Sequence, residues 1–324
     1  MDEKLIIKKY LKPLANSKDS LQLRDDVANI NVADEKYIVT NQDSLVMGTH
    51  FFESDDPKYI AKKSLRVNLS DLISKGVTPY GYFLSLAMDD TIDENWIKLF
   101  SQGLAEDQKK YNITLLGGDT VSAPHGLFIS INMLSRTNDS IIKRSGACYG
   151  DNIYVTGTIG NSAIGLHLLK NKNDYLGLGQ LDIQKLIRKY HLPDPRLKII
   201  HLIKKFASSS MDTTDGLIND LLVLAGSSGR KFIIKKNLIP YSLSAKKFLN
   251  NYGDFDIALY GGDDYEVIFT SPMKFEDKLN EYAKKIKLKI TKIGNVGSTS
   301  KNPGLFDEKY KEFKASYYTF KHFK

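Results

Sequence analysis

The sequence predicts an α/β fold divided between two domains. Segments with the period-two pattern of a strand alternate with segments whose apolar residues recur at helical spacing. The 324 residues, of which 42% are hydrophobic and 26% charged, suffice for two domains with substantial cores. A polar, glycine-bearing stretch at 143–151 separates two such series, so we expect one domain over 1–147 and another over 148–324.

The first domain is expected to hold four strands and two helices. One helix starts where Asp56 and Pro57 supply an N-cap and a first-turn proline, and it stops at Gly76. The other helix, 93–111, shows amphipathic spacing. The expected strands are 37–46, 82–88, 113–116, which runs into Gly117-Gly118-Asp119, and 127–135.

Two pairs of polar residues interrupt the apolar pattern of this domain. The period of two places Asn41 and Asp43 on one face of the first strand. Asn68 and Asp71 lie three residues apart on one flank of the first helix, off its apolar stripe. A polar pair so placed in a mostly buried helix requires either a partner or an ion.

The second domain repeats the alternation of strands and helices. A Gly-Gly-Asp element occurs once in each half of the chain, at 117–119 and 261–263, which hints at two related layers. The expected elements are a strand at 152–156, a turn at 157–160, a helix from Ser162, a break at 193–196, a helix at 217–225 and a strand at 265–270, followed by a further helix and strand.

The charge of the chain does not indicate a nucleic-acid binder. Its net charge is +8 and its pI about 9.1, but the lysines are scattered over segments that look like polar helix faces. No basic stripe with interleaved aromatic residues is present. We therefore expect a lysine-rich solvated surface, part of which could steer an anionic substrate, and no nucleic-acid partner.

Nothing in the sequence points to a membrane or to secretion. No apolar run approaches the ~20 residues of a spanning helix, and the first residues alternate charged with apolar side chains. The single cysteine, Cys148, excludes an internal disulfide and a cysteine-based zinc cluster, and we expect it to be a small filler. A cytoplasmic location follows as an expectation.

Aspartates recur beside glycines and small polar residues in six places along this basic chain. Solubility gives no reason to gather carboxylates in a protein of net charge +8, whereas hard cations do. Mg²⁺ prefers oxygen ligands and is usually held by one or two carboxylates together with substrate phosphates. The pattern therefore predicts a Mg²⁺–polyphosphate enzyme. The motifs are Arg24-Asp25-Asp26, Asn41-Gln42-Asp43, Asn68-Leu69-Ser70-Asp71, Gly117-Gly118-Asp119, Met211-Asp212-Thr213-Thr214-Asp215-Gly216 and Gly261-Gly262-Asp263-Asp264.

Any one of these motifs could be an ordinary turn, because Asp and Gly are common turn formers. The 211–216 motif says more, since two carboxylates and two hydroxyls crowd a strand-to-helix junction where a helix N-terminus also favours phosphate. The phosphate loop of P-loop enzymes, the dinucleotide fingerprint, the protein-kinase sequences and the serine nucleophile elbow are all absent. ATP, if bound, is therefore bound by another route.

Two further side chains, His50 and Arg144, could each have either a structural role or a role in binding. His50 could be a satisfied histidine at a strand end or a substrate contact. Arg144 could cap a neighbouring carboxylate, or its planar guanidinium could bind phosphate beside the glycine at 146.

Taken in order, the motifs resemble those of the thiamine-monophosphate kinase family, which is related to aminoimidazole ribonucleotide synthetase and selenophosphate synthetase. The resemblance covers nearly the whole chain, and the 43–51 stretch points to the thiamine branch. It rests on Asp25-Asp26, Asp43-Ser44-Leu45-Val46-x-Gly48-x-His50-Phe51, Asn68-Leu69-Ser70-Asp71-Leu72, Gly117-Gly118-Asp119-Thr120, Arg144-Ser145-Gly146-Ala147, Gly150-Asp151-x-Ile153-Tyr154-Val155-Thr156-Gly157, Asp212-x-Thr214-Asp215-Gly216-Leu217, Gly261-Gly262-Asp263-Asp264-Tyr265-Glu266 and His322-Phe323.

The resemblance implies a two-domain aminoimidazole ribonucleotide synthetase-like fold. The N-terminal domain would build a β-barrel across a homodimer, and the C-terminal α/β domain would complete a cleft for ATP and several Mg²⁺ ions. The implied metal ligands are Asp26, Asn41, Gln42, Asp43, Asp71, Asp119, Asp212 and Asp215. The implied nucleotide contacts are Tyr111, Gly118, Asp119, Arg144 and Thr214, and the implied contacts to thiamine monophosphate are His50, Asp263 and Phe320.

The chain departs from the family pattern at several of these positions. Arg24 stands where the family has Gly, and Asn41 and Gln42 stand where hydroxyl residues are common. Their amide oxygens are neutral ligands, so the number of metal ions stays open. Asp263 replaces Glu and is shorter by a methylene, and Thr214 replaces Ser and keeps the hydroxyl. Phe320 keeps an aromatic surface for the thiazolium or pyrimidine ring.

The implied reaction is direct transfer of the γ-phosphoryl group of ATP to thiamine monophosphate. A phosphate monoester has a second pKa of about 6 and is mostly dianionic near pH 7, so we expect no general base. Catalysis would consist of positioning and charge neutralisation by Mg²⁺ ions that the six carboxylates gather. Three alternatives stay open: a sister synthetase with another acceptor, a non-catalytic Mg·ATP-binding homologue, and a nucleic-acid binder.

Overall fold

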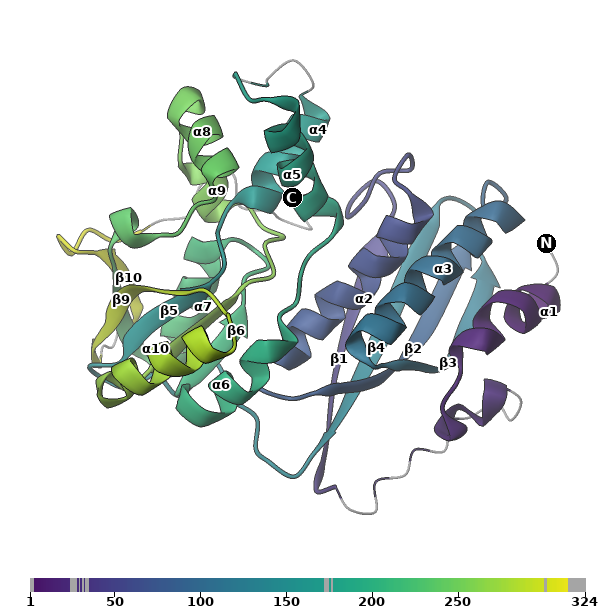
Figure 1. The fold of residues 1–324 in the computed structure, drawn as a ribbon, viewed down its shortest axis with the longest axis horizontal. Helices are drawn as coiled ribbons and strands as arrows, with labels where there is room; N and C mark the ends of the chain where they lie inside the picture. The colour runs from purple at the N-terminus through teal and green to yellow at the C-terminus, as the bar shows by residue number, and fades with distance from the viewer. Residues whose placement is uncertain are drawn as a thin grey trace. The chain divides into compact units, whose positions relative to one another are not determined.

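The computed structural model describes residues 3–23, 28, 30, 32, 35–171, 175, 177–299 and 302–313. Contacts divide the chain into two compact units (Figure 1), Met1–Ile73 with Val77–Ser140, and Ser74–Gly76 with Ile141–Lys324. The division between 140 and 141 lies a few residues before the expected boundary between 147 and 148. Both units combine a sheet with helices, which confirms the predicted α/β fold class.

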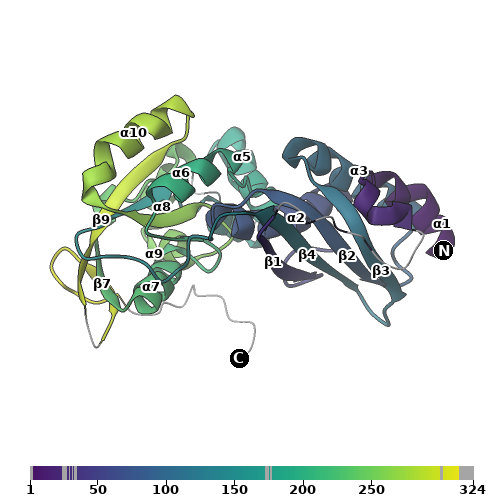
Figure 2. The same ribbon diagram turned by 90° about the horizontal axis from the view of Figure 1, so that it is seen from below.

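The first unit is a four-stranded sheet with two long helices over one face (Figure 2). The strand order is β1-β4-β2-β3; β4 pairs antiparallel with both β1 and β2, and β2 and β3 are parallel. Gly117-Gly118-Asp119 lies inside β3 and not in a turn after it, because the strand continues for several residues beyond the expected end. The elements are α1 (Glu3–Ile6), β1 (Tyr37–Val46), α2 (Pro57–Ser74), β2 (Pro79–Met88), α3 (Glu94–Tyr111), β3 (Thr114–Ser122) and β4 (Leu127–Thr137).

Close packing and a buried ion pair fix α2 against α3. A Cβ at Gly103 of α3 would lie 2.6 Å from the carbonyl oxygen of Lys58, so only glycine permits this approach of the helices. Arg66 Nε donates to Asp107 Oδ2 at 2.6 Å, and Arg66 Nη2 donates to Asp107 Oδ1 at 2.8 Å, both within the buried interior. The α2 helix, which carries Asn68 and Asp71, is therefore held rigidly over the sheet.

We expect Gly103→Val to destabilise the first unit by more than about 2 kcal/mol, because an added side chain must push α2 away from α3. Thermal or urea unfolding of the purified variant measures the change. The matched control is Gly226→Ala, since that helical glycine has open space around it, and we expect this change to be neutral or to stabilise by about 0.5–1 kcal/mol. Equal stability of the two variants would contradict the packing argument.

The other face of the same sheet carries one row of polar side chains and one row of exposed apolar side chains. Ser44, Ser130, Ser85 and Asp119 occupy one register row across the four strands, and Ser44 Oγ lies 3.0 Å from Ser130 Oγ. The next row includes the apolar residues Val46, Phe128 and Val121, which are 39%, 39% and 50% exposed. In the described part of the first unit, no long helix covers this face.

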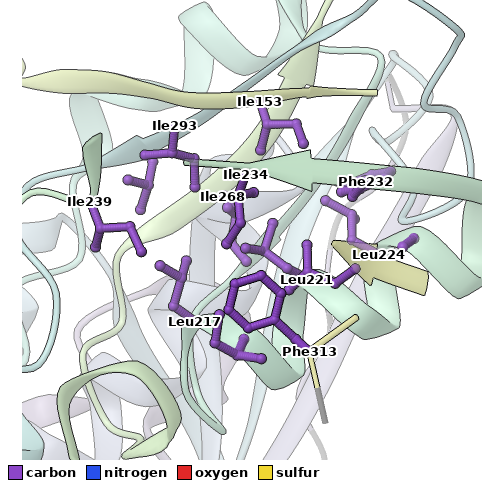
Figure 3. Packing of buried hydrophobic residues seen from close by; sticks show 14 of the residues in the cluster. Ile153, Leu217, Leu221, Leu224, Phe232, Ile234, Ile239, Ile268, Ile293 and Phe313 are labelled. Atoms are coloured by element: carbon purple, nitrogen blue, oxygen red, sulfur yellow. The ribbon is translucent and has the colours of Figure 1, made fainter. Parts of the chain in front are cut away.

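The second unit is built on a six-stranded mixed sheet of order β10-β7-β9-β5-β8-β6. Leucines 217, 221 and 224 on one side of α7 pack against Ile153, Ile234, Ile268 and Ile293 from four strands (Figure 3). The elements are β5 (Asn152–Thr156), α4 (Asn161–Lys170), α5 (Gln180–His191), α6 (Ile200–Phe206), β6 (Ser209–Asp212), α7 (Leu217–Ser228), β7 (Arg230–Ile234), α8 (Leu243–Tyr252), α9 (Asp256–Tyr260), β8 (Val267–Ser271), α10 (Glu276–Lys285), β9 (Ile290–Thr299) and β10 (Gly304–Asp307).

Among the described residues, no helix is both long enough and apolar enough to cross a bilayer.

Candidate active site

Two aspartates face each other between β1 and α2 in the first unit. Asn68 of α2 is fully buried, and its Oδ1 accepts hydrogen bonds from the Asp43 amide and from Asn41 Nδ2, both at 3.1 Å. Asn41 Nδ2 also donates to Asp71 Oδ2 at 2.9 Å. The two polar pairs expected on the strand and on the helix therefore meet, and Asn68 fixes their relative positions.

The carboxyl group of Asp71 lies close enough to Asp43 to oppose the ionisation of Asp43. Burial raises the pKa of the Asp43 carboxyl to about 7, and the charge of Asp71 and a hydrogen bond between the two carboxyls add to the shift. The buried Oδ1 of Asn41 accepts no hydrogen bond from any described residue. Two crowded carboxylates and an unsatisfied amide oxygen are a donor set that suits a hard cation such as Mg²⁺.

Gln42 does not join this group. Its side chain lies on the opposite face of β1, where its Nε2 donates to Ser130 Oγ at 3.1 Å. The expectation that Gln42 binds a metal beside Asp43 needs correction for its side chain, because successive residues of a strand point to opposite faces of the sheet. Gln42 therefore lies on the helix-free face of the sheet, in contact with Ser130.

The glycine-rich segment of β3 forms a smooth edge beside a cavity. Gly118 has φ +158°, and a Cβ there would lie 1.9 Å from the carbonyl oxygen of Leu84, so no side chain fits. Asp119 is exposed, and its Oδ1 accepts from the amide of Thr120 at 2.9 Å. The adjoining cavity of about 430 Å³ is lined by 117–120 and by residues that include Ile7, Leu11 and Phe83. Backbone amides and a carboxylate at an open edge suit a phosphate with its cation.

Within one chain, Asp119 and Asp43 lie on the two edge strands of the sheet. Three strand spacings of about 4.8 Å separate β1 from β3, and the two side chains also point to opposite faces. In the part of the chain that the structure describes, no three or more Asp, Glu, His or Cys side chains gather closely enough to hold a metal. Of the described carboxylates expected to bind metal in the first unit, Asp43 and Asp71 therefore lie together and Asp119 lies apart from them.

Two other predicted contacts lie in the first unit: His50, which is partly exposed, and Tyr111, which is buried. His50 Nδ1 accepts a hydrogen bond from the amide of Val46 at 3.0 Å, so this nitrogen is unprotonated and the neutral ring carries its proton on Nε2. Lys63 Nζ donates to the His50 carbonyl at 3.0 Å and fixes the loop. Tyr111 is only 3% exposed, with Lys110 Nζ 4.7 Å from the centre of its ring, so its contact with a nucleotide stays a prediction that requires the ring to be uncovered.

In the second unit, the 211–216 and 261–266 segments interlock through their backbones. The amides of Asp263 and Tyr265 donate to the carbonyls of Thr214 and Thr213, at 2.9 and 2.8 Å, and the Thr213 amide donates to the Glu266 carbonyl at 2.7 Å. Gly262 and Gly216 allow this approach, since a Cβ at either would lie within 2.5 Å of backbone atoms. The structure thus brings predicted metal, nucleotide and substrate residues into one double loop.

Asp212 and Asp215 frame the start of α7, and a third carboxylate lies behind them. Asp212, at the end of β6, is 2% exposed, whereas Asp215 is exposed. Asp220 Oδ2 accepts from the amides of Thr214 and Asp215, at 2.9 and 3.2 Å. Burial raises the pKa of Asp220 well above its ordinary value, and the charges of Asp215 and Asp212 raise it further. The sequence signal for Asp220 was its place in the first turn of α7, where a carboxylate faces free amides.

A partly buried ion pair that the sequence does not reveal supports the same double loop. Arg196 Nε and Nη2 donate to Glu266 Oε2 and Oε1, at 2.9 and 2.7 Å, and Thr156 Oγ1 donates to Oε2 at 2.6 Å. A Cβ at Gly157 would lie 1.9 Å from Glu266 Oε1. The sequence places Arg196 only in the break at 193–196, because the long-range partner of a lone arginine is not visible in a sequence.

Three other predicted positions have less structural support. Arg144 is exposed in the segment before β5, where its carbonyl accepts from Ser228 Oγ at 3.0 Å. Asp26 and Phe320 lie outside the described residues.

Comparisons with known proteins identify the family of the chain. Residues 24–137 match the family model described as AIR synthase related protein, N-terminal domain. The thiamine-monophosphate kinase of Buchnera aphidicola subsp. Acyrthosiphon pisum is 36% identical over 313 residues, which are 94% of this chain and 94% of that protein.

Solved structures give the same relationship. The crystal structure of thiamine-monophosphate kinase from Stenotrophomonas maltophilia is 30% identical, with a TM-score of 0.80 and coverage of 88% of this chain and 89% of the other. A structure of AaThiL complexed with AMPPCP and TMP is also 30% identical, with a TM-score of 0.80 and coverage of 92% and 91%. The chain belongs to the thiamine-monophosphate kinase family.

Proposed function

We propose that this chain phosphorylates thiamine monophosphate with ATP and forms thiamine diphosphate, the last step in the biosynthesis of that cofactor. A relative that matches nearly its whole length is named thiamine-monophosphate kinase, and the similar AaThiL structure holds AMPPCP together with TMP. The observation in this chain that carries the proposal is the pair Asp43–Asp71, held face to face by Asn68 in a helix-covered site. A half-buried pair of like charges is costly unless it serves a ligand of opposite charge.

The donor sets of the two units suit several Mg²⁺ ions. In the first unit, Asp43 and Asp71 would hold an ion with the unsatisfied Oδ1 of Asn41. In the second, Asp212 and Asp215 would contribute carboxylates at the start of α7. Bound Mg²⁺ neutralises phosphate charge and orients the groups between which the phosphoryl group moves.

The other residues would bind and orient the two substrates. The open edge at Gly118 would admit phosphate to the backbone amides of β3. The hydroxyl of Thr214 and the guanidinium of Arg144 would contact the nucleotide. His50 and Asp263 would contact thiamine monophosphate, with Asp263 directed at the cationic or amino-bearing rings, because a carboxylate repels the phosphate. No general base is required, since the acceptor phosphate is already ionised near pH 7.

A homodimer is part of the proposal. The helix-free face of the sheet offers exposed Val46, Phe128 and Val121, and two four-stranded sheets suffice for an eight-stranded barrel. Pairing the edges of two such sheets would place the Asp119 side of one protomer next to the Asp43 side of its partner. This arrangement would bring next to each other the two edge strands that a single sheet keeps apart.

We place the reaction in the cytoplasm, because ATP is the co-substrate and the only cysteine, Cys148, is exposed and free. Neither a membrane nor a nucleic acid is a proposed partner.

Incubation of the purified chain with ATP, Mg²⁺ and thiamine monophosphate tests the function. Mass spectrometry is expected to detect thiamine diphosphate and ADP in equal amounts, and EDTA should abolish both. A sister synthetase would consume ATP without any dependence on thiamine monophosphate. A non-catalytic homologue would bind Mg·ATP, measurable by calorimetry, without turnover. Either result would overturn the proposal.

A further inference from the structure

A carboxylate next to the proposed substrate contact, Asp264, is fastened to the beginning of α4. Its Oδ2 accepts from the amide of Gly160 at 2.5 Å, and its Oδ1 accepts from the amide of Ser162 at 3.2 Å. Both oxygens are therefore committed to backbone groups in the first turn of that helix. These two hydrogen bonds tie the loop between α9 and β8 to the start of α4.

The helix start is shaped for this attachment. Gly160, in the N-cap position of α4, has φ +82°, and a Cβ there would lie 2.2 Å from the Cβ of Ala258 in α9. Glycine is thus required both by the left-handed backbone and by the contact with α9. Burial raises the pKa of Asp264 to about 7, although the two amide hydrogen bonds act in the opposite direction.

Both neighbours of Asp264 have left-handed backbone conformations. Asp263 has φ +69° and Tyr265 has φ +50°, values that few non-glycine residues adopt. Such strain persists only where surrounding contacts over-determine it, and it gathers at ligand sites. Four hydrogen bonds hold the loop in this conformation. The carboxylate of Asp264 accepts two from the start of α4, and the amides of Asp263 and Tyr265 donate to the carbonyls of Thr214 and Thr213.

The same geometry fixes the side chain of Asp263. Tyr265 Oη donates to Asp263 Oδ1 at 3.2 Å, a contact that depends on the paired left-handed residues. Asp263 is shorter than the glutamate typical of the family, so its position depends more on the backbone that carries it. The two hydrogen bonds that Asp264 accepts from the start of α4 fix the conformation of that backbone.

We propose that Asp264 is a positioning residue for the acceptor substrate: by binding the first turn of α4 it holds Asp263 in the strained conformation that contacts thiamine monophosphate. This inference rests on the proposed function for the identity of the substrate. Asp264 itself does not touch the reacting atoms. It acts through Asp263, so its loss weakens acceptor binding more than it slows the transfer step.

The test compares Asp264→Asn and Ser162→Pro with wild type. Asn keeps one acceptor oxygen but turns an NH₂ group toward the second amide, while Pro removes the Ser162 donor and is tolerated in a first helical turn. We expect the KM for thiamine monophosphate to rise about tenfold in each variant, with kcat and the KM for ATP within about threefold of wild type. Two variants on the two sides of the contact keep the test valid where one fails to fold.

The matched control is Asp151→Asn. Asp151 is 2% exposed and accepts from the amide of Cys148 at 2.9 Å, but it lies outside the double loop. We expect neither KM to change in this variant. A tenfold rise in the KM for thiamine monophosphate in the control, or equal rises for ATP and thiamine monophosphate in the Asp264 variant, would assign Asp264 a general structural role and overturn the inference.

Hydrogen–deuterium exchange of the ligand-free proteins separates this inference from the function on which it rests. We expect faster exchange in Asp264→Asn over 257–267, where the Asp263 and Tyr265 amides lie, and no change over β5. Unaltered exchange with an unaltered KM would overturn the positioning role alone. A wild-type chain with no activity on thiamine monophosphate would overturn the proposed function, and with it the assigned substrate, while exchange would still report whether Asp264 holds the loop.

Discussion

Asp43→Asn is expected to lower turnover by at least about a thousandfold while stabilising the metal-free protein. Turnover falls because the carboxylate that faces Asp71 would hold a Mg²⁺ ion, and metal-assisted charge neutralisation supplies most of the rate in phosphoryl transfer. Stability rises because an amide removes the repulsion between two half-buried carboxylates. Steady-state kinetics at saturating Mg²⁺ and urea unfolding in EDTA measure the two effects.

The stabilisation depends on pH in a direction that follows from the raised pKa. In the unfolded chain Asp43 ionises near its ordinary 3.8, whereas in the folded protein it ionises near 7. The folded state therefore loses stability relative to the unfolded state as the pH rises from about 4 to about 7, and the loss is constant above that. We expect Asp43→Asn to gain nothing at pH 4 and about 1–3 kcal/mol at pH 8.

The control for this prediction is Asp90→Asn, an exposed aspartate of the same unit. It should alter neither turnover nor stability, and Asp71→Asn should behave like Asp43→Asn in turnover. Near-wild-type activity in both site variants would contradict the assignment of the metal pair. Loss of activity together with lower stability at pH 8 would show that the two carboxylates do not repel each other in the folded state.

The local part of this site was readable from the sequence, because it depends on short-range periodicity. The alternation of a strand placed Asn41 and Asp43 on one face, helical spacing placed Asn68 and Asp71 on one flank, and the structure joins the two pairs. The same alternation also excludes Gln42 from that face. Its assignment came from the family resemblance, and the residue-level pattern was the better guide.

The long-range part was not readable, because strand order and loop pairing depend on contacts between distant segments. Gly117-Gly118-Asp119 was expected to follow a strand that ends at Leu116, but it continues β3 at the edge of the sheet farthest from Asp43. Asp220 and Glu266 are buried carboxylates that resemble ordinary surface residues in a sequence. Only the fold shows that one holds the amides of Thr214 and Asp215 and that the other binds Arg196.

Mixing two inactive variants, Asp43→Asn and Asp119→Asn, is expected to restore activity. In the proposed dimer each site combines Asp43 from one protomer with Asp119 from its partner, since one sheet holds these residues on opposite edge strands. A mixed dimer then has one site with both changes and one site with neither. After random reassortment half of the dimers are mixed, so about a quarter of wild-type activity should return.

The control for this prediction is a mixture of Asp43→Asn with Asp71→Asn. Both residues belong to the same side of the site, so every site in a mixed dimer carries one defect and the mixture should stay inactive. The variants are co-expressed with two different affinity tags, and dimers bearing both tags are isolated and assayed. Such dimers should have about half of wild-type activity for the Asp43–Asp119 pair and none for the Asp43–Asp71 pair. Inactivity of both would mean that one chain supplies Asp43 and Asp119 to the same site, and the sheet edges would then have no part in forming it.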